Sequence, residues 1–437
     1  MKKGLYFVLF SLALFSCKYD QSQTTDTGAA TDSSANLDAS ITLPQGFKAQ
    51  VFAENLGEGG RHIAVNENGD VYVQMHTLHG GKGIAALRDT TGDGKADITE
   101  YFGSNTGTGM EIQSGHLYCS SDDAVYRYDL KPGQLVPDEN TRVLLVGGFP
   151  AQNEHASKSL ALDGAGNIYV NIGAPSNACQ VENRSAGSPG QDPCPLLENH
   201  AGIWRFDANK IAQQAKDGKR YASGIRNAVG LTWNSATNGL FAMQHGRDQL
   251  SEFWPDLYTP EQNAELPAEE FFQINEGDFF GWPYCYFDPM QNEKVLSPEY
   301  GGDGKKTGRC DQAKDPIVAF PAHMAPNDVI FYNGKMYPEQ YQNGAFIAFH
   351  GSWNRSPKEQ KGYYVVFVPF KDGKVSGQWE PFADGFAGVK PIPSPGDAKH
   401  RPCGLAIGPD GALYVSDSVE GKIWKIVYGG ERGGSSI

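Results

Sequence analysis

The chain repeats one pattern of apolar and polar positions along most of its length. An apolar stretch is followed by a few polar turn residues that include Gly, and then by a second apolar stretch that contains an aromatic residue. Short apolar runs joined by a Gly-containing turn are typical of β-hairpins. The pattern occurs six times, at residues 62–73, 110–118, 159–170, 229–241, 328–347 and 404–415.

Further alternating segments follow several copies, for example residues 125–128 and 203–206. Strands in repeated sets, with few helical periods, are the signature of a β-propeller. The sequence therefore predicts an all-β fold, a six-bladed β-propeller over residues 41–430. A β-sandwich or a β-helix with coincidental hairpins is the alternative.

Segments outside the six copies complete this prediction. Residues 46–52 precede the first copy and residues 422–427 follow the last, so pairing them in one blade would close the ring and remove exposed strand edges. The stretch between residues 245 and 321 is rich in aromatics and Pro, and we expect it to be an insertion over one face. Residues 431–437 are expected to form a flexible tail.

The N-terminus predicts export. Lys2 and Lys3 precede an apolar run that ends at Cys17, and this run is too short to span a bilayer. We interpret residues 1–17 as a lipoprotein signal peptide with Cys17 as the lipidated residue; an ordinary secretory signal is the alternative. Residues 18–40 carry few large apolar side chains and are expected to be a disordered tether. The expected location is the bacterial cell envelope, on the periplasmic or surface side of the outer membrane, with membrane contact only through the anchor.

Charge and cysteine content add two constraints. A net charge of −14 and a pI near 5.2 argue against nucleic acid as a partner. Six cysteines remain after Cys17, in a chain expected to meet an oxidising compartment. Cys179 with Cys194, and Cys285 with Cys310, each bracket a short polar segment, so two local disulfides are expected. The state of Cys119 and Cys403 stays open.

Several charged residues stand beside the predicted innermost strands. His155, Arg226 and Arg401 each lie just before such a strand, and Arg355 lies just after a strand. In a propeller these positions share one mouth of the central channel, so the blades would bring the side chains together. Clustered guanidinium groups are costly unless an anion neutralises them. The pattern indicates a polyanionic small ligand, with a surface salt bridge as the alternative for any one arginine.

The motifs around these residues resemble the glucose/sorbosone dehydrogenase family, and the sorbosone-dehydrogenase-like branch most of all. The resemblance covers residues 43–428. It is carried by the segments 155–160, 224–227, 244–248, 275–284, 350–355 and 400–406. Members of this family are six-bladed propellers that use the quinone cofactor PQQ.

The resemblance implies a role for each matched residue. PQQ carries three carboxylates, and Arg226, Arg355 and Arg401 would bind them, with Asn227 and His245 beside the cofactor. A Ca²⁺ ion would be held by the backbone carbonyls at Gly246 and Arg247 and would polarise the quinone. His155 would be the general base that takes the substrate's hydroxyl proton. A quinone or a cytochrome would then accept the electrons.

The chain departs from the glucose enzyme at three places. Glu154 stands where that enzyme has Asp, and His245 and Arg247 stand where it has Gln and Pro. The segment 353–355 replaces a lysine-bearing cofactor loop. Substrate specificity therefore does not carry over from the resemblance.

A second metal motif occupies residues 89–100. Oxygen ligands recur there at the spacing of a calcium loop, with Gly at the sixth position. These ligands are Asp89, Thr91, Asp93, the Lys95 carbonyl, Asp97 and Glu100. A structural Ca²⁺ turn between strands and a plain solvated Asp/Gly turn both explain the motif.

The leading hypothesis is a PQQ- and Ca²⁺-dependent dehydrogenase that oxidises an aldose or a sugar-derived aldehyde. Two alternatives share the fold: a non-catalytic cell-surface propeller that binds carbohydrate or protein, and a calcium-dependent lactonase. His155 together with the three arginines favours the dehydrogenase, because a tricarboxylate ligand explains them all.

Overall fold

The computed structural model of the chain describes residue 1 and residues 36–430. The predicted signal peptide with Cys17, most of the predicted tether and the predicted tail lie outside the described residues. The last part of that tether, residues 36–40, is described, and it contacts the propeller. Leu37 pairs with Gln50, and Asp38 Oδ2 accepts a hydrogen bond of 2.9 Å from Trp424 Nε1. The folded domain therefore begins slightly before the predicted boundary.

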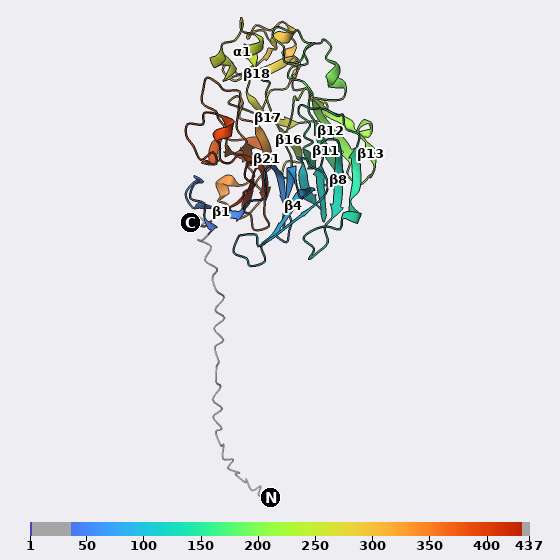
Figure 1. The fold of residues 1–437 in the computed structure, drawn as a ribbon, viewed down its shortest axis with the longest axis vertical. Coiled ribbons are helices and arrows are strands. Elements are labelled where there is room, and N and C mark those ends of the chain that lie inside the picture. The colour runs from blue at the N-terminus through green and yellow to red at the C-terminus, as the bar shows by residue number, and fades with distance from the viewer. Residues whose placement is uncertain (2–35, 431–437) are drawn as a thin grey trace. The chain divides into compact units, whose positions relative to one another are not determined.

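Six sheets form the blades of the predicted propeller (Figure 1), which confirms the fold class; their strands pair antiparallel, except that β13 pairs parallel with β9. Blade 1 contains β2 (Gly60–Val65), β3 (Val71–His79), β4 (Lys82–Arg88) and β5 (Ile98–Phe102). Blade 2 contains β6 (Met110–Gln113), β7 (His116–Ser120), β8 (Ala124–Asp129) and β9 (Val143–Gly147), joined by β13 (Gln213–Gln214). Blade 3 contains β10 (Leu160–Leu162), β11 (Asn167–Ile172), β12 (Gly202–Asp207) and β14 (Lys219–Ser223). Blade 4 contains β15 (Gly230–Asn234), β16 (Gly239–Gln244), β17 (Glu269–Ile274) and β20 (Val318–Phe320). Blade 5 contains β21 (Pro326–Phe331), β22 (Ala345–Phe349), β23 (Tyr364–Val368) and β26 (Glu380–Ala383). Blade 6 contains β27 (Pro402–Ile407), β28 (Leu413–Asp417), β29 (Ile423–Tyr428) and β1 (Phe47–Ala53).

The ring closes as the sequence predicted. Strand β1 from the N-terminal end pairs with β29 from the C-terminal end, with Phe47 opposite Tyr428. This pairing builds blade 6 from both ends of the chain. The edges of β1 and β29 that face each other are hydrogen-bonded and therefore not exposed.

Apolar side chains between neighbouring blades form the core. One cluster joins blades 5 and 6 and includes the fully buried Trp424, Phe346 and Phe386. Burying a side chain of this size contributes about 2 kcal/mol relative to leaving it in water. The alternating apolar positions of each hairpin therefore supply the interfaces that hold the ring together.

The predicted insertion between residues 245 and 321 includes two strands that belong to a blade. Residues 269–274 and 318–320 lie within it, yet they are the outer strands β17 and β20 of blade 4. The apolar pattern of β17 is hard to see in the sequence. A strand with one solvated face buries apolar residues, but β17 begins with two buried glutamates, Glu269 and Glu270.

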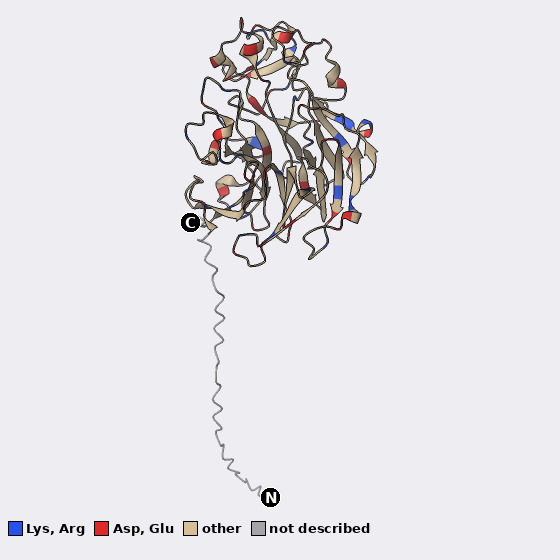
Figure 2. Ribbon diagram, viewed as in Figure 1, with Lys and Arg blue, Asp and Glu red and all other residues tan. Residues whose placement is uncertain are grey.

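The rest of the insertion gathers at one end of the propeller, at the top of Figure 1. It contains α1 (Leu250–Phe253), α2 (Pro260–Asn263) and the hairpin of β18 (Cys285–Asp288) and β19 (Glu293–Leu296). Figure 2 shows acidic residues on the short helices there. The remaining short elements are β24 (Phe370–Lys371), β25 (Lys374–Val375) and the 3₁₀ helices Glu139–Thr141, Pro195–Glu198, Ala215–Asp217, Pro298–Tyr300, Gly308–Gln312, Glu339–Tyr341 and Pro395–Asp397.

Both predicted disulfides, Cys179–Cys194 and Cys285–Cys310, are present. They lie in one apolar cluster with Trp282. Cys119 and Cys403 are buried free thiols, which answers the question that the sequence left open. Within the described residues, no helix is both long and apolar enough to cross a membrane.

The motif at residues 89–100 folds as a hydrogen-bonded turn. Asp89 accepts hydrogen bonds from the backbone N–H groups of Thr91, Gly92 and Gly94. Asp97 accepts from the backbone N–H and the hydroxyl of Thr90. Nowhere in the described residues do three His, Cys, Asp or Glu side chains converge as a metal cage would need. These hydrogen bonds hold the turn together, and the binding of Ca²⁺ by it stays a prediction.

Candidate functional site

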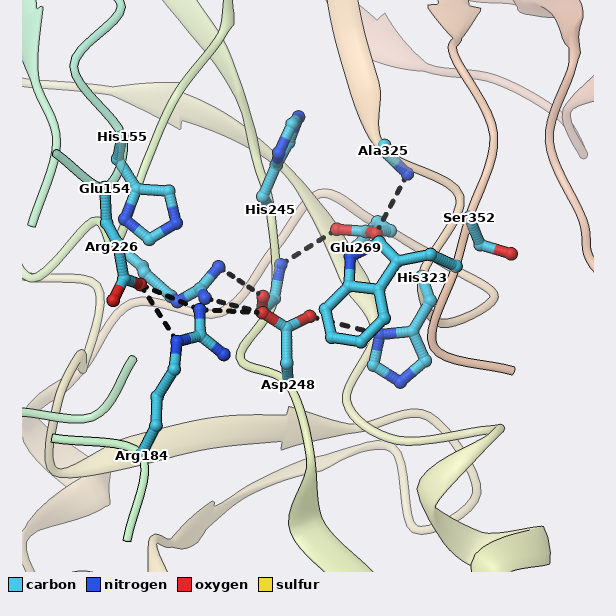
Figure 3. A pocket seen from close by; sticks show the side chains of 12 residues that line it. Glu154, His155, Arg184, Arg226, His245, Asp248, Glu269, His323, Ala325 and Ser352 are labelled. Carbon is cyan, nitrogen blue, oxygen red and sulfur yellow. Dashed lines mark hydrogen bonds and ion pairs between the residues drawn. The ribbon is translucent and has the colours of Figure 1, made fainter. Parts of the chain in front are cut away.

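A pocket of about 470 Å³ lies where blades 3, 4 and 5 meet the insertion. Its volume is in the range of small-molecule sites, roughly 300–1,000 Å³. Figure 3 shows charged side chains pointing toward one another around it. The lining residues are Glu154, His155, Arg184, Arg226, His245, Gly246, Asp248, Glu269, His323, Ala325, Ser352 and Trp353.

The imidazole of His155 is held in one orientation and one tautomer. Its Nδ1 lies 2.5 Å from the carbonyl oxygen of Ala174. Because a carbonyl only accepts, Nδ1 carries the proton and Nε2 keeps a free lone pair. Burial, followed by the positive charge of Arg226, lowers the pKa of His155 to about 3. His155 is therefore an uncharged base throughout the neutral pH range.

The backbone around His155 is strained and tightly fastened. Its φ of 54° is left-handed, which a residue with a side chain adopts at a cost of about 1–3 kcal/mol. Gln152 Nε2 donates to the carbonyls of Glu154 and His155 at 2.8 and 2.9 Å, and also to the carbonyl of Gly173. A Cβ on Gly173 would lie 2.7 Å from the His155 Cβ, so only glycine permits this approach. Such strain persists only where its surroundings enforce it, and it is typical of functional sites.

A chain of alternating charges runs beside His155. Arg226 Nη2 lies 2.8 Å from Asp248 Oδ2, and Arg184 Nη2 lies 3.4 Å from the same oxygen. Arg184 also binds Glu154 Oε2 at 2.8 Å. Burial alone would raise the pKa of Asp248, but the Arg226 guanidinium holds that pKa below its usual value. All four groups are therefore ionised at neutral pH.

Glu269 occupies the opposite wall and is electrostatically different. Its two oxygens accept hydrogen bonds from the backbone N–H groups of Gly246 and Ala325, at 2.9 and 3.1 Å. Burial nevertheless raises the pKa of Glu269 to about 7. Nearby, the ring nitrogen Nε2 of His245 bonds the Pro326 carbonyl at 2.9 Å, and burial lowers the pKa of that histidine to about 4. The charge of this wall therefore changes near neutral pH through Glu269 alone.

The structure brings together four of the residues named from the sequence. His155, Arg226, His245 and Gly246 all line the pocket. The amide oxygen of Asn227 lies behind the wall, 3.0 Å from Asn171 Nδ2.

Of the two backbone positions expected to hold Ca²⁺, Gly246 lines the pocket and Arg247 does not. The carbonyl of Gly246 accepts a hydrogen bond of 2.8 Å from Arg226 Nη1. The side chain of Arg247 turns away from the pocket and pairs with the buried Glu299 at 2.5 Å.

The two other predicted arginines do not line the pocket, which corrects the expected ring of guanidinium groups. Arg355 is 1% exposed, and its nitrogens donate to the carbonyls of Ala264, Ala322 and Glu359 and to the Glu265 carboxylate. Its charge is satisfied by the protein, because the loop after β22 folds against the insertion.

Arg401 lies one layer behind the pocket wall. Its Nε and Nη2 donate to the carbonyls of His350 and Gly351 at 3.0 and 2.9 Å, and its guanidinium lies over the Tyr363 ring. Those two carbonyls directly precede Ser352 and Trp353, which line the pocket. Arg401 therefore supports the wall instead of presenting its charge to the cavity.

Four charged or titratable lining residues were not assigned to the site from the sequence: Arg184, Asp248, Glu269 and His323. His323 lies just before the inner strand β21, as His155 lies before β10, so the same positional rule would have found it. Asp248 belongs to the quoted segment 244–248. Arg184 lies inside a disulfide loop without any strand period, and its sequence carries no such signal.

Comparison with known proteins identifies the family of this chain. The family described as TrAA12-like matches residues 41–429. The chain belongs to this family. This confirms the resemblance to PQQ-dependent sugar dehydrogenases at the level of the family.

Relatives extend over most of the chain. A protein of Borreliella burgdorferi without an assigned function is 24% identical over 409 residues, which cover 90% of this chain and 92% of that protein. A pyrroloquinoline quinone-dependent pyranose dehydrogenase of Coprinopsis cinerea is 26% identical; the match covers 74% of this chain but only 46% of that longer enzyme. A pyrroloquinoline quinone-dependent sugar dehydrogenase of Hypocrea jecorina is 23% identical over 75% of each chain.

Solved structures share the fold. A calcium structure of the Trichoderma reesei family AA12 enzyme superposes with a TM-score of 0.71 at 20% identity, covering 89% of this chain and 97% of that one. The holo PQQ domain of the Coprinopsis cinerea pyranose dehydrogenase gives a TM-score of 0.70 at 20% identity, with the same coverage.

Proposed function

We propose that this chain is a PQQ- and Ca²⁺-dependent dehydrogenase that oxidises an aldose or a sugar-derived aldehyde. The observation that carries the proposal is the uncharged imidazole of His155, whose free Nε2 belongs to a charged pocket in a family with PQQ-dependent relatives.

The pocket's donor set suits a planar ligand with carboxylates. Arg226 supplies a guanidinium group, which pairs well with carboxylates, while Arg184 is engaged by Glu154 and Gln249. Trp353 is 55% exposed and lines the same pocket, so its indole offers a flat surface for an aromatic ring system. PQQ would be held by Arg226 and Trp353, with Arg401 as support for the wall.

The balance of charge favours a divalent cation as well. Both arginines are already paired with Glu154 and Asp248, and Glu269 adds negative charge above its pKa of about 7. A tricarboxylate would therefore meet little net positive charge. Ca²⁺ at the backbone carbonyls of Gly246 and Arg247 would supply it, because hard cations prefer oxygen ligands.

When bound, PQQ supplies the two-electron acceptor for the hydride that leaves the substrate carbon. The residues of this chain handle the proton: the substrate's O–H bond breaks and His155 Nε2 takes the proton, as an aldose becomes a lactone. The carboxylates of Glu154 and Asp248 stabilise the imidazolium that forms. The electrons then pass to a quinone or a cytochrome.

The cellular setting is part of the proposal. Lipidation at Cys17 would hold the enzyme at the bacterial envelope, and the sugar would reach it from outside the cytoplasm. Labelling of the expressed full chain with a palmitate analogue, compared with Cys17→Ser, tests the anchor.

The test of function is reconstitution of metal-stripped protein with PQQ and Ca²⁺. Binding is followed by absorbance and fluorescence, and dye reduction is then assayed on aldoses, aldehydes and alcohols. We expect stoichiometric PQQ binding and sugar-dependent reduction. A folded protein that fails to bind PQQ at micromolar concentration would overturn the proposal.

A further inference from the structure

The loop closed by Cys179–Cys194 contributes Arg184 to the lining of the pocket. It carries Asn183 and Arg184, and both side chains reach Glu154, the residue directly before His155. Asn183 Nδ2 donates to Glu154 Oε1 at 2.9 Å, and Arg184 Nη2 donates to Oε2 at 2.8 Å. Both oxygens of this carboxylate are therefore held by a loop that is distant from it in sequence.

This loop is itself fixed to the insertion. The N–H of Gly190 donates to the Glu299 carbonyl, and the N–H of Gly187 donates to the Phe253 carbonyl, each at 2.9 Å. Its disulfide shares a buried apolar cluster with the second disulfide, Cys285–Cys310. The loop thus acts as a rigid mount for Arg184.

Most N–H groups of the Arg184 guanidinium are engaged by the protein. Nε and Nη2 bind Glu154, Nη1 binds Gln249 Oε1 at 2.7 Å, and Nη2 also reaches Asp248. Its side chain is 29% exposed, so the edge that faces the pocket has little donor capacity left. Its main role is therefore toward its neighbours.

We propose that Arg184 is a positioning residue for His155. Arg184 binds Glu154 and thereby fixes the strained backbone at the adjacent His155. This keeps His155 Nδ1 bonded to the Ala174 carbonyl and leaves Nε2 free. The Cys179–Cys194 loop holds Arg184 in place. This inference rests on the proposed function for its catalytic meaning, although the orientation of the histidine can be measured without it.

The kinetic test replaces Arg184 by Met, which keeps length but removes the donors. We expect kcat to fall by about 30-fold, because small displacements of a catalytic base are costly. The KM for sugar and the Kd for PQQ should stay within about twofold, since a positioning residue contributes little to binding. Arg184→Lys should recover part of kcat. A loosened PQQ Kd with unchanged kcat would instead make Arg184 a ligand contact and overturn the proposal.

Arg309→Met is the matched control. Arg309 ties the same loop through Asp192, at 2.5 Å, but does not line the pocket. Its loss should leave kcat within about twofold of the parent. An equal loss of kcat in both variants would show general loosening of the loop and would contradict a specific role for Arg184.

A second readout needs neither PQQ nor sugar. In cofactor-free protein with ¹⁵N-labelled histidine, assigned with His155→Asn, NMR at neutral pH reports the tautomer of each imidazole. We expect one Nδ1–H tautomer for His155 in the parent chain and a mixture in Arg184→Met. An unchanged spectrum in Arg184→Met would overturn the positioning role. If the tautomer mixture appeared but the parent protein never bound PQQ, only the proposed function would be overturned.

The disulfide is tested by Cys179→Ser combined with Cys194→Ser. If circular dichroism shows a folded propeller, the variant should reproduce the kcat loss and the tautomer mixture of Arg184→Met. A folded variant with parental kcat would show that the loop does not need its disulfide as a mount. If the variant does not fold, Arg184→Met alone decides the proposal.

Discussion

The arginines on the blade 3–4 side of the pocket and those on the blade 5–6 side have different partners. Arg184 and Arg226 line the cavity and bind carboxylates that also line it, Glu154 and Asp248, and Arg226 donates in addition to the carbonyls of Asn177 and Gly246. Arg355 and Arg401 donate mainly to backbone carbonyls and stay outside the cavity. The same side chain is thus part of the ligand site on one side and part of the scaffold on the other.

The difference shows what decides the role of a buried guanidinium. An arginine keeps its charge in almost any environment, so its surroundings must supply acceptors. Where the nearby acceptors are lining carboxylates, the charge remains part of the cavity. Where they are carbonyls of a folded loop, the charge stabilises that loop.

The largest effect is expected at His155, the proposed base, which lies on the blade 3–4 side. His155→Ala should lower kcat by at least about a thousandfold, because proton abstraction would then depend on water. PQQ affinity should stay within a few-fold, as the arginines remain. Steady-state kinetics and a PQQ titration check this, with His116→Ala as control, since His116 begins β7 of blade 2 and does not line the pocket. Retained turnover would show that another group is the base.

Two matched substitutions test the comparison directly. Arg226→Met should weaken PQQ binding by about 100-fold, because a charge-assisted pair to the ligand is lost and Asp248 loses its closest cationic partner. Arg355→Met should instead lower the free energy of unfolding by about 3 kcal/mol, because two buried carbonyls and a partly buried one lose their donor and Glu265 keeps only Lys358 as a cationic partner.

Urea unfolding and PQQ titration of both variants separate these effects. The folded Arg355→Met protein should bind PQQ within about threefold of the parent, as it lines no part of the cavity. If both variants lost PQQ affinity equally, the two sides of the pocket would not differ as described.

A smaller effect is expected from Glu269. Its pKa of about 7 means that it is protonated at pH 6 and ionised at pH 8. Without Ca²⁺, PQQ affinity should therefore fall by about tenfold as the pH rises across this range, because the new charge repels the ligand's carboxylates. In Glu269→Gln, which keeps one of the two amide hydrogen bonds, the dependence should vanish. The same slope in the variant would assign the titration to another group.

The smallest effect is expected away from the pocket, at Glu111 in β6. Burial raises the pKa of its carboxyl from 4.5 to about 8, so the folded state retains a proton that the unfolded state has released. Stability is therefore lost as the pH rises from about 4.5 to 8. Gln cannot ionise and can still accept from the Leu162 N–H.

Thermal unfolding at two pH values checks this expectation. Glu111→Gln should match the parent near pH 5 and exceed its Tm by roughly 2 °C near pH 8.5. Glu67→Gln, on an exposed turn, is the control. A gain of the same size at pH 5 would mean that the effect is not linked to ionisation.

Much of the fold followed from local pattern. The hairpin repeats, the pairing of β1 with β29 and both disulfides could be predicted, because burial on alternating faces and short Cys-bounded loops are visible along the chain. Strand β17 could not, because two buried glutamates obscure its pattern. His155 and Arg226 were found in the same way, since both stand just before an inner strand.

By itself, the sequence determined that six hairpin units close into a ring and that one mouth of the ring collects His155 and Arg226. Only the tertiary structure decided that Arg355 serves the scaffold, that Arg184 reaches Glu154 from a distant loop, and that Glu269 is buried deeply enough to titrate near pH 7. The physical reason is that strand formation depends on neighbouring residues, whereas the partner of a charge and its degree of burial depend on segments far apart in the chain.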